Sequence, residues 1–203
     1  MLETDKKREL IIEGAIKRFI HFGIHKTTMN EIAEDLSVSK PSLYYYFPDK
    51  SSLVLGVVEK IFNDYFDVLY RDQKLGTPIE ATLLNIIEIK HKFFLRYYML
   101  HLSYGNPDSS LSSAELKAYL ETMVAKNLKF HESVFELAVA NKELAPQEDI
   151  PKIAELYLSC QSGLTSLCIM HGNKELFPGK KELKIMKDKQ ISLSKIFIKG
   201  LKN

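Results

Sequence analysis

The chain has 203 residues, a formal net charge of +2, a hydrophobic content of 45%, two cysteines and no tryptophan. This length suits one small domain joined to a larger one with a sizeable core. No apolar run reaches the roughly 18–20 residues of a membrane span, and the charged start MLETDKKREL lacks the apolar segment of a signal peptide. Cys160 and Cys168, about 12 Å apart along a helix, are too distant to bridge each other. We therefore expect a reduced, cytoplasmic protein without a membrane anchor.

The first predicted element is an amphipathic helix over residues 8–23. Its apolar side chains recur at helical spacing, and Gly23 is a typical residue to end it. These apolar residues are Ile11, Ile12, Ala15, Ile16 and Phe19.

Residues 27–50 predict a helix–turn–helix. Thr28 and Glu31 have the spacing of a capping box, in which each side chain satisfies a backbone donor of the other residue. Ser37 falls in the turn, where a positive φ would strain a serine. Ser39 is a good N-cap for the second helix.

The second helix of this motif has one predicted buried stripe, formed by Leu43 and Phe47 at i and i+4. Pro41 falls in its first turn, where a missing N–H costs nothing. The outer face then carries hydroxyls and a lysine, a combination that suits a DNA groove. Its members are Lys40, Ser42, Tyr44, Tyr45 and Tyr46.

A second interpretation is that the tyrosines pack in a core and the lysines are merely solvated. Residues 1–50 carry as many acidic as basic side chains, whereas DNA-binding domains are usually basic. The lysine excess lies in residues 174–203, where a solvated helical face is the preferred explanation.

From Arg8 to Leu55 the sequence resembles the N-terminal domain of the tetracycline-repressor (TetR) family of bacterial transcription regulators. The residues that carry the likeness are Ala15, Phe19, Gly23, Thr27, Thr28, Ile32, Ala33, Val38, Ser39, Lys40, Leu43, Tyr44, Phe47 and Lys50. The sequence departs from the family pattern at Ser37, at Pro41 and at Met29, which stands where a polar residue often meets a phosphate.

The resemblance implies roles for individual residues on double-stranded DNA. Thr28, Ser39, Tyr45 and Lys50 are expected to contact phosphates. Lys40, Pro41, Ser42 and Tyr44 are expected against base edges or the groove wall, and Tyr46 in either position.

Helical periodicity continues to the C-terminus, with turn signals between predicted helices at 50–72, 78–103, 112–142, 149–172 and 181–201. The predicted fold is all-α: a three-helix DNA-binding domain over residues 1–49 is followed by a larger ligand-binding and dimerisation domain over residues 50–203.

Aromatic residues are dense in the predicted larger domain, where core packing and a ligand cavity are competing explanations. The resemblance implies an effector pocket there, although no residue motif marks it. The expected lining is Phe62, Tyr65, Phe66, Phe93, Tyr97, His101, Tyr104, Met123, Phe130 and Tyr157. His101 and His131 are candidates to hold a polar group of a small, largely apolar ligand, or they are ordinary packed histidines.

The last two predicted helices interleave small and large apolar residues, a pattern that lets helices approach closely. The resemblance implies that they pair with a second subunit, and a homodimer suits a palindromic operator. The expected interface residues are Ser159, Gly163, Ser166, Leu167, Met170 and Ile196.

An enzyme is the rival class, but the sequence has no phosphate-binding glycine loop, no HExxH and no CxxC. We predict no catalytic residues, no metal and no cofactor. The expected function is a DNA-binding regulator, in the usual case a repressor released by its ligand. The alternative is a helical sensor or carrier that no longer binds DNA.

Overall fold

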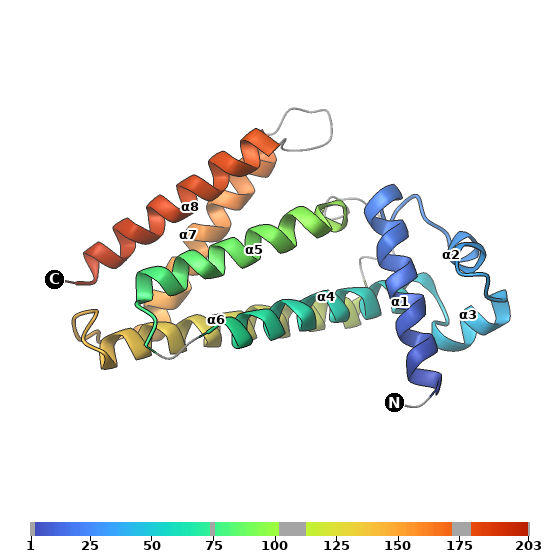
Figure 1. The fold of residues 1–203 in the computed structure, drawn as a ribbon, viewed down its shortest axis with the longest axis horizontal. Helices are drawn as coiled ribbons and strands as arrows, with labels where there is room; N and C mark the ends of the chain where they lie inside the picture. Colours follow the sequence, from blue (N-terminus) through green and yellow to red (C-terminus); the bar gives the residue numbers. More distant parts are fainter. Residues whose placement is uncertain (1–2, 74–75, 102–112, 172–179, 203) are drawn as a thin grey trace. The chain divides into compact units, whose positions relative to one another are not determined.

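The computed structural model describes residues 3–73, 76–101, 113–171 and 180–202. Within these ranges the chain forms eight helices and no strand, which confirms the all-α prediction (Figure 1). The helices are α1 (Glu3–Phe22), α2 (Met29–Asp35), α3 (Lys40–Tyr46), α4 (Lys50–Asp72), α5 (Ile79–His101), α6 (Ala114–Ala140), α7 (Ile150–His171) and α8 (Lys180–Gly200).

The five long helices predicted after residue 49 begin and end within two residues of their predicted bounds. The first helix differs more, because it begins at Glu3 rather than at residue 8. The added residues are mostly charged, and lysine, arginine and glutamate are good helix formers that need no buried face to extend a helix. Apolar periodicity, which starts only at Ile11, therefore missed this charged first segment of the helix.

Contacts divide the chain into two units, Met1–Val68 with Lys92–Met123 and Leu69–His91 with Val124–Asn203. Three of the long helices, α4, α5 and α6, contribute one segment to each unit. This grouping differs from a division at residue 49, which the sequence predicted from the start of α4.

In the first unit, α1, α2 and α3 bury their apolar faces against one another and against α4. The core includes Ile11, Phe19, Leu43 and Leu53, each fully buried. Leu116 at the start of α6 joins the same core. A domain of about fifty residues buries little apolar surface and is only marginally stable, and these additions enlarge its core.

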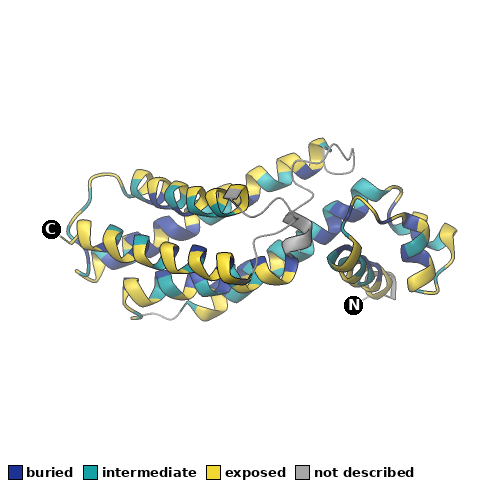
Figure 2. Cartoon of the chain, turned by 90° about the horizontal axis from the view of Figure 1, so that it is seen from above, coloured by how far each residue is buried: buried dark blue, intermediate teal, exposed yellow. Residues whose placement is uncertain are grey.

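In the second unit, α7 and α8 form a closely packed pair with a polar network at its centre. Each helix shows a buried and an exposed side (Figure 2). No helix in the described ranges is both long and apolar enough to span a bilayer.

Candidate nucleic-acid interface

Both ends of α2 are fixed by local hydrogen bonds. The hydroxyl of Thr28 accepts a hydrogen bond from the backbone N–H of Glu31 at 3.3 Å, and the carboxylate of Glu31 accepts from the backbone N–H of Thr28 at 2.8 Å. This is the predicted capping box. The Thr28 hydroxyl also donates to Glu31 at 2.8 Å, so it must change partner before it can donate to a phosphate.

The turn after α2 contains Ser37 with φ = 53°, in the left-handed region. Its N–H donates to the carbonyl of Glu34, and the N–H of Val38 donates to that of Ala33, both at 3.0 Å. This pair of bonds is the Schellman motif, which usually places glycine where Ser37 stands. The turn thus reaches its geometry at the cost of a strained serine.

Two of the three acidic residues on α2, Glu31 and Asp35, are paired within the first unit. The guanidinium of Arg18 lies 2.8 Å from the carboxylate of Glu31 and 2.7 Å from that of Asp35. The Thr28 hydrogen bonds, with a smaller effect of Arg18, lower the pKa of Glu31. Because Glu31 and Asp35 share the cation of Arg18, their negative charges are paired and do not oppose DNA beside α3, the predicted DNA-reading helix (the reading helix).

The exposed face of α3 carries the side chains that the sequence predicted for DNA. Ser39 caps the helix by accepting from the N–H of Ser42 at 3.3 Å, and Leu43 is fully buried. Tyr44 and Tyr45 are 44% and 77% exposed, although large aromatic side chains are usually covered. Lys40 and Pro41 are exposed, Ser42 and Tyr46 are partly buried, and the Tyr46 ring meets Tyr45 edge-on at 5.1 Å.

Phe47, at the end of α3, is held between α1 and α4. The guanidinium of Arg8 lies 5.2 Å from the centre of its ring and also pairs with Glu59 on α4 at 3.8 Å. Gly56 on α4 faces the same ring so closely that a Cβ would lie 3.0 Å from it. This contact fixes the orientation of the reading helix on α4. The sequence gives no sign that Arg8 and Gly56 hold Phe47, because no local pattern signals a contact between three helices.

The start of α4 is capped by Asp49, whose carboxylate accepts from the N–H of Ser52 at 2.7 Å. Lys50, the expected phosphate contact, is the first residue of α4 and is partly buried. Met29 is 6% exposed and belongs to the core, so its side chain is not available to a phosphate.

The residues expected to line an effector pocket fall into two groups. Phe62, Tyr65, Phe66, Phe93, Tyr97 and Met123 belong to the first unit, and Phe130 and Tyr157 to the second. His101 ends α5, but its side chain, like the whole of Tyr104, lies outside the described residues.

The aromatic group of the first unit is continuous. The ring of Tyr65 lies 5.3 Å from Phe66 and 5.4 Å from Phe93, which lies 5.8 Å from Tyr97. Tyr119 and Phe62 form a further aromatic pair in this unit, with their rings 6.2 Å apart, and the Tyr119 hydroxyl is buried without a hydrogen-bond partner among the described residues. Burial raises the pKa of both Tyr65 and Tyr119. The Tyr119 hydroxyl therefore offers a polar contact among these aromatic side chains.

Tyr157 lies in a different environment, within the α7–α8 pair. Its hydroxyl lies 2.8 Å from that of Ser194 and accepts from the side-chain amide of Gln161 at 3.0 Å. The ring packs against Phe197 at 5.3 Å and is 2% exposed. These partners of Tyr157 are all side chains of α7 and α8. This favours a role for Tyr157 in packing the two helices together rather than in binding a ligand.

The outer faces of α7 and α8 form an apolar groove of about 660 Å³. Gly163, Leu167 and Ile196, three of the expected interface residues, line it. Leu167, Met170 and Ile196 are 51%, 78% and 70% exposed, while Ser159 and Ser166 are exposed small residues on the same helix. The described residues include no cluster of side chains suited to hold a metal ion.

A sequence model described as "Bacterial regulatory proteins, tetR family" matches residues 11–57. The chain is 24% identical over 151 residues to IcaR of Staphylococcus epidermidis, a negative regulator of the biofilm operon icaADBC, covering 74% of this chain and 80% of IcaR. It is 40% identical over 75 residues to the transcriptional regulator RutR of Escherichia coli, a match that spans 37% of this chain but only 35% of RutR.

Solved structures show the same fold. A transcriptional regulator from Cytophaga hutchinsonii has a TM-score of 0.83 and 26% identity, covering 97% of this chain and 99% of the other. A regulator from Saccharomonospora viridis, solved in complex with choline, has a TM-score of 0.71 and 14% identity, covering 94% and 96% of the two chains.

Proposed function

Since the chain belongs to the TetR family of bacterial transcriptional regulators, we propose that it is a repressor that leaves a palindromic operator when a small molecule binds. The relatives are regulators rather than enzymes. The DNA-binding part of this proposal is supported by the exposed face of α3. Lys40, Tyr44 and Tyr45 are exposed on this helix, whereas Leu43 is its buried residue. A protein that reads the chromosome acts in the cytoplasm, and we place it there.

The repressor role is supported by the match to IcaR, which is named as a negative regulator. The dimer is supported by the exposed apolar groove on α7 and α8. Two-fold symmetry of the protein then requires a two-fold repeat in the operator, with the two half-sites about one helical turn of DNA apart.

Response to a small molecule is supported by the continuous aromatic cluster of the first unit and by the buried, unpartnered hydroxyl of Tyr119. The choline complex of the Saccharomonospora viridis regulator, a protein of the same fold, is consistent with this kind of site.

The proposed coupler is α4. Its first two turns include Gly56, which meets Phe47 together with Arg8. About 22 Å from its first residue, the same helix carries Phe62, Tyr65 and Phe66, which are aromatic residues of the first unit. A ligand that prefers one tilt of this helix changes the separation of the two reading helices in the dimer. A ligand with equal affinity for both tilts would shift nothing.

The test is selection of bound fragments from random duplex DNA, followed by fluorescence anisotropy on the selected sequence. We expect a two-fold repeat, and we expect Tyr44→Ala to abolish sequence preference while weak binding to all DNA persists. Tyr70→Ala, at an exposed tyrosine on α4 outside α3, is the matched control. A folded wild-type dimer that selects no sequence would contradict the proposal and favour a sensor that has lost DNA binding.

A further inference from the structure

Arg18 on α1 holds two carboxylates of α2 from a position that is largely covered. Its guanidinium lies 2.8 Å from Glu31 and 2.7 Å from Asp35, and its carbon lies 4.9 Å from the centre of the Phe22 ring. Only 15% of the side chain is exposed, and its Nε is buried without a hydrogen-bond partner among the described residues. A covered guanidinium that already has two partners is poorly placed to bind a phosphate itself.

The two carboxylate oxygens of Glu31 have different partners. Oε1 faces Arg18, whereas Oε2 accepts from the backbone N–H and from the hydroxyl of Thr28, both at 2.8 Å. The hydroxyl oxygen of Thr28 accepts in turn from the N–H of Glu31 at 3.3 Å. The capping box consists of the two bonds from backbone N–H groups, so it persists when the hydroxyl of Thr28 donates to another acceptor.

Thr28 is exposed, and its hydroxyl is expected to contact a phosphate of the DNA backbone. A phosphate oxygen that accepts this proton lies about 2.7 Å from the hydroxyl oxygen. Because the same hydroxyl oxygen lies 2.8 Å from Oε2 of Glu31, the phosphate and the carboxylate then come within about 6 Å of each other. Two negative charges at this distance repel each other, and physiological salt screens the repulsion only in part.

We propose that Arg18 is a positioning residue for DNA binding, which holds the carboxylate of Glu31 while the hydroxyl of Thr28 turns from Glu31 to a phosphate oxygen. This turn replaces one hydrogen bond from a hydroxyl to an anion by another, so no donor is lost. The charge of Glu31 stays paired with Arg18, which offsets the repulsion that the phosphate would otherwise meet. The inference rests on the DNA-binding function proposed above and gives a part in it to a residue that does not touch DNA.

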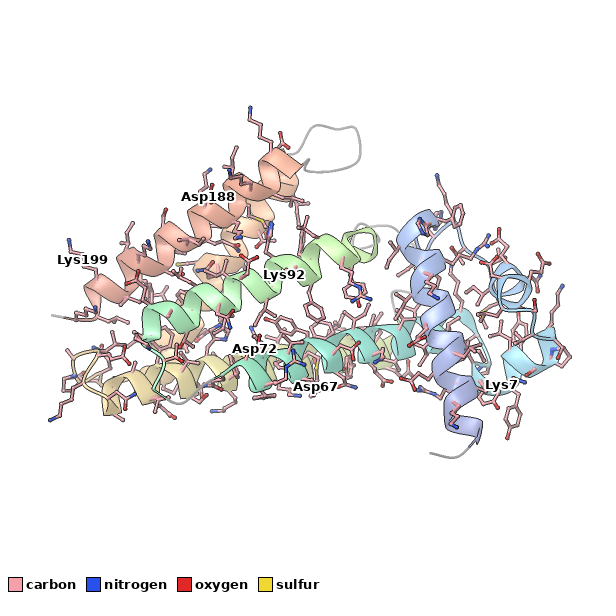
Figure 3. All side chains as sticks on the ribbon, in the orientation of Figure 1. Lys7, Asp67, Asp72, Lys92, Asp188 and Lys199 are labelled. Atoms are coloured by element: carbon pink, nitrogen blue, oxygen red, sulfur yellow. The ribbon has the colours of Figure 1, made fainter. Side chains whose placement is uncertain are left out.

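The decisive variant is Arg18→Gln, which removes the cation. Arg71→Gln, at an exposed arginine beside Asp72 at the end of α4 (Figure 3), is the matched control. Circular dichroism and thermal unfolding are measured first, so that binding is compared at a temperature where every variant is folded.

Fluorescence anisotropy then gives the affinity for the selected sequence and for an unrelated duplex. We expect Arg18→Gln to weaken binding to both by about tenfold, because the unpaired charge of Glu31 repels a phosphate that every sequence has. We expect Arg71→Gln to leave both affinities unchanged. An Arg18→Gln variant that binds as tightly as the wild type would overturn the inference and leave the proposed function intact.

A second substitution separates the proposed role from a direct phosphate contact and from a purely structural one. In the Arg18→Gln background, Glu31→Gln should restore most of the lost affinity, because glutamine keeps the capping box but carries no charge. Asp35→Asn removes the other carboxylate that Arg18 holds, two turns of α2 beyond Thr28, and should give no such rescue. Equal rescue by Asp35→Asn would indicate an effect of net charge alone, and failure of Glu31→Gln to rescue would indicate a direct or structural role of Arg18. Either result would overturn the inference.

Glu31→Gln by itself gives a test that does not depend on the folding of Arg18→Gln. With Arg18 in place the charge of Glu31 is already paired, so we expect the single change to alter DNA affinity little. A gain of about tenfold would show that Arg18 leaves the charge uncompensated, and it would overturn the inference. A folded wild-type protein that binds no DNA would contradict the proposed function and the inference with it.

Discussion

Ser37 and Lys142 occupy equivalent positions at the ends of two helices. Their φ values are 53° and 60°, and each precedes a residue whose N–H donates back to the helix, Val38 to Ala33 and Glu143 to Ala138. In both places a residue with a Cβ occupies the left-handed region, which costs about 1–2 kcal/mol relative to glycine.

We predict that Ser37→Gly stabilises the protein by about 0.5–1 kcal/mol, since relief of the backbone strain exceeds the entropy that glycine adds to the unfolded chain. The melting temperature should rise by about 2–4 °C for each kcal/mol in a chain of this size. Lys142→Gly should behave in the same way, whereas Ala140→Gly, inside the last turn of α6, should destabilise. A lower melting temperature for Ser37→Gly would show that the serine side chain contributes more than its backbone costs.

Lys50 provides a prediction about the phosphate backbone. We predict that Lys50→Ala weakens binding to all DNA sequences by a similar factor and lowers the salt slope of binding by about one unit, because one counterion fewer is released. Anisotropy titrations at several salt concentrations measure this slope. Lys152→Ala, at an exposed lysine on α7, should leave it unchanged. An unaltered slope for Lys50→Ala would remove Lys50 from the phosphate contacts.

At the scale of helices, α7 and α8 are joined by a buried network of hydrogen bonds. The side-chain nitrogen of Gln161, which carries two protons, lies within hydrogen-bond distance of three acceptors: the hydroxyl of Tyr157, the hydroxyl of Ser194 at 2.9 Å and the backbone carbonyl of Gln190 at 3.2 Å. The side chain of Gln190 donates in return to the carbonyl of Gln161 at 3.3 Å. Three of these hydrogen bonds join Gln161 of α7 to Gln190 or Ser194 of α8. The network therefore fixes the register of the two helices.

We predict that Tyr157→Phe lowers the free energy of unfolding by about 1–2 kcal/mol, because Gln161 and Ser194 lose a buried partner. Operator release by an effector should be unaffected, since the hydroxyl is fully used within the pair. Tyr45→Phe, which removes a hydroxyl from a ring that is 77% exposed, should leave stability unchanged. A Tyr157→Phe variant of normal stability with an altered effector response would restore Tyr157 to the ligand site.

For the whole molecule, we propose that the outer faces of α7 and α8 form the dimer interface. Besides Leu167, Met170 and Ile196, this pair exposes Leu156, Ile169 and Ile185 by 45–55%. A contiguous apolar surface of this kind on a soluble protein marks an interaction site.

We predict that Gly163→Glu converts the dimer to a monomer, because it would bury an unpaired carboxylate at the interface at a cost of several kcal/mol. Apart from the backbone of α7 itself and the two neighbouring residues, nothing in the described part of the chain lies within 4 Å of the Cβ that the change adds, so the fold of the single chain should survive. Sedimentation should show the monomer, and circular dichroism should be unchanged. Operator affinity should collapse, because one chain presents only one reading helix. Lys152→Glu should stay dimeric, and a dimeric Gly163→Glu would place the interface elsewhere.

The sequence by itself determined the helices, their caps and the helix–turn–helix. These features depend on residues three or four positions apart, such as Thr28 with Glu31 or Leu43 with Phe47, and so they can be identified without knowledge of the fold. The face of α3 that remains exposed follows from the same spacing.

Only the tertiary structure decided which distant residues meet. It brought Leu116 into the core of the first three helices, divided the expected effector residues between two units, and placed the Tyr157 hydroxyl in a buried hydrogen-bond network. It also set Arg8 against Phe47. The physical reason is that periodicity shows which side of a helix is buried, whereas the partner of that side depends on how long helices pack together, and no local spacing records that choice.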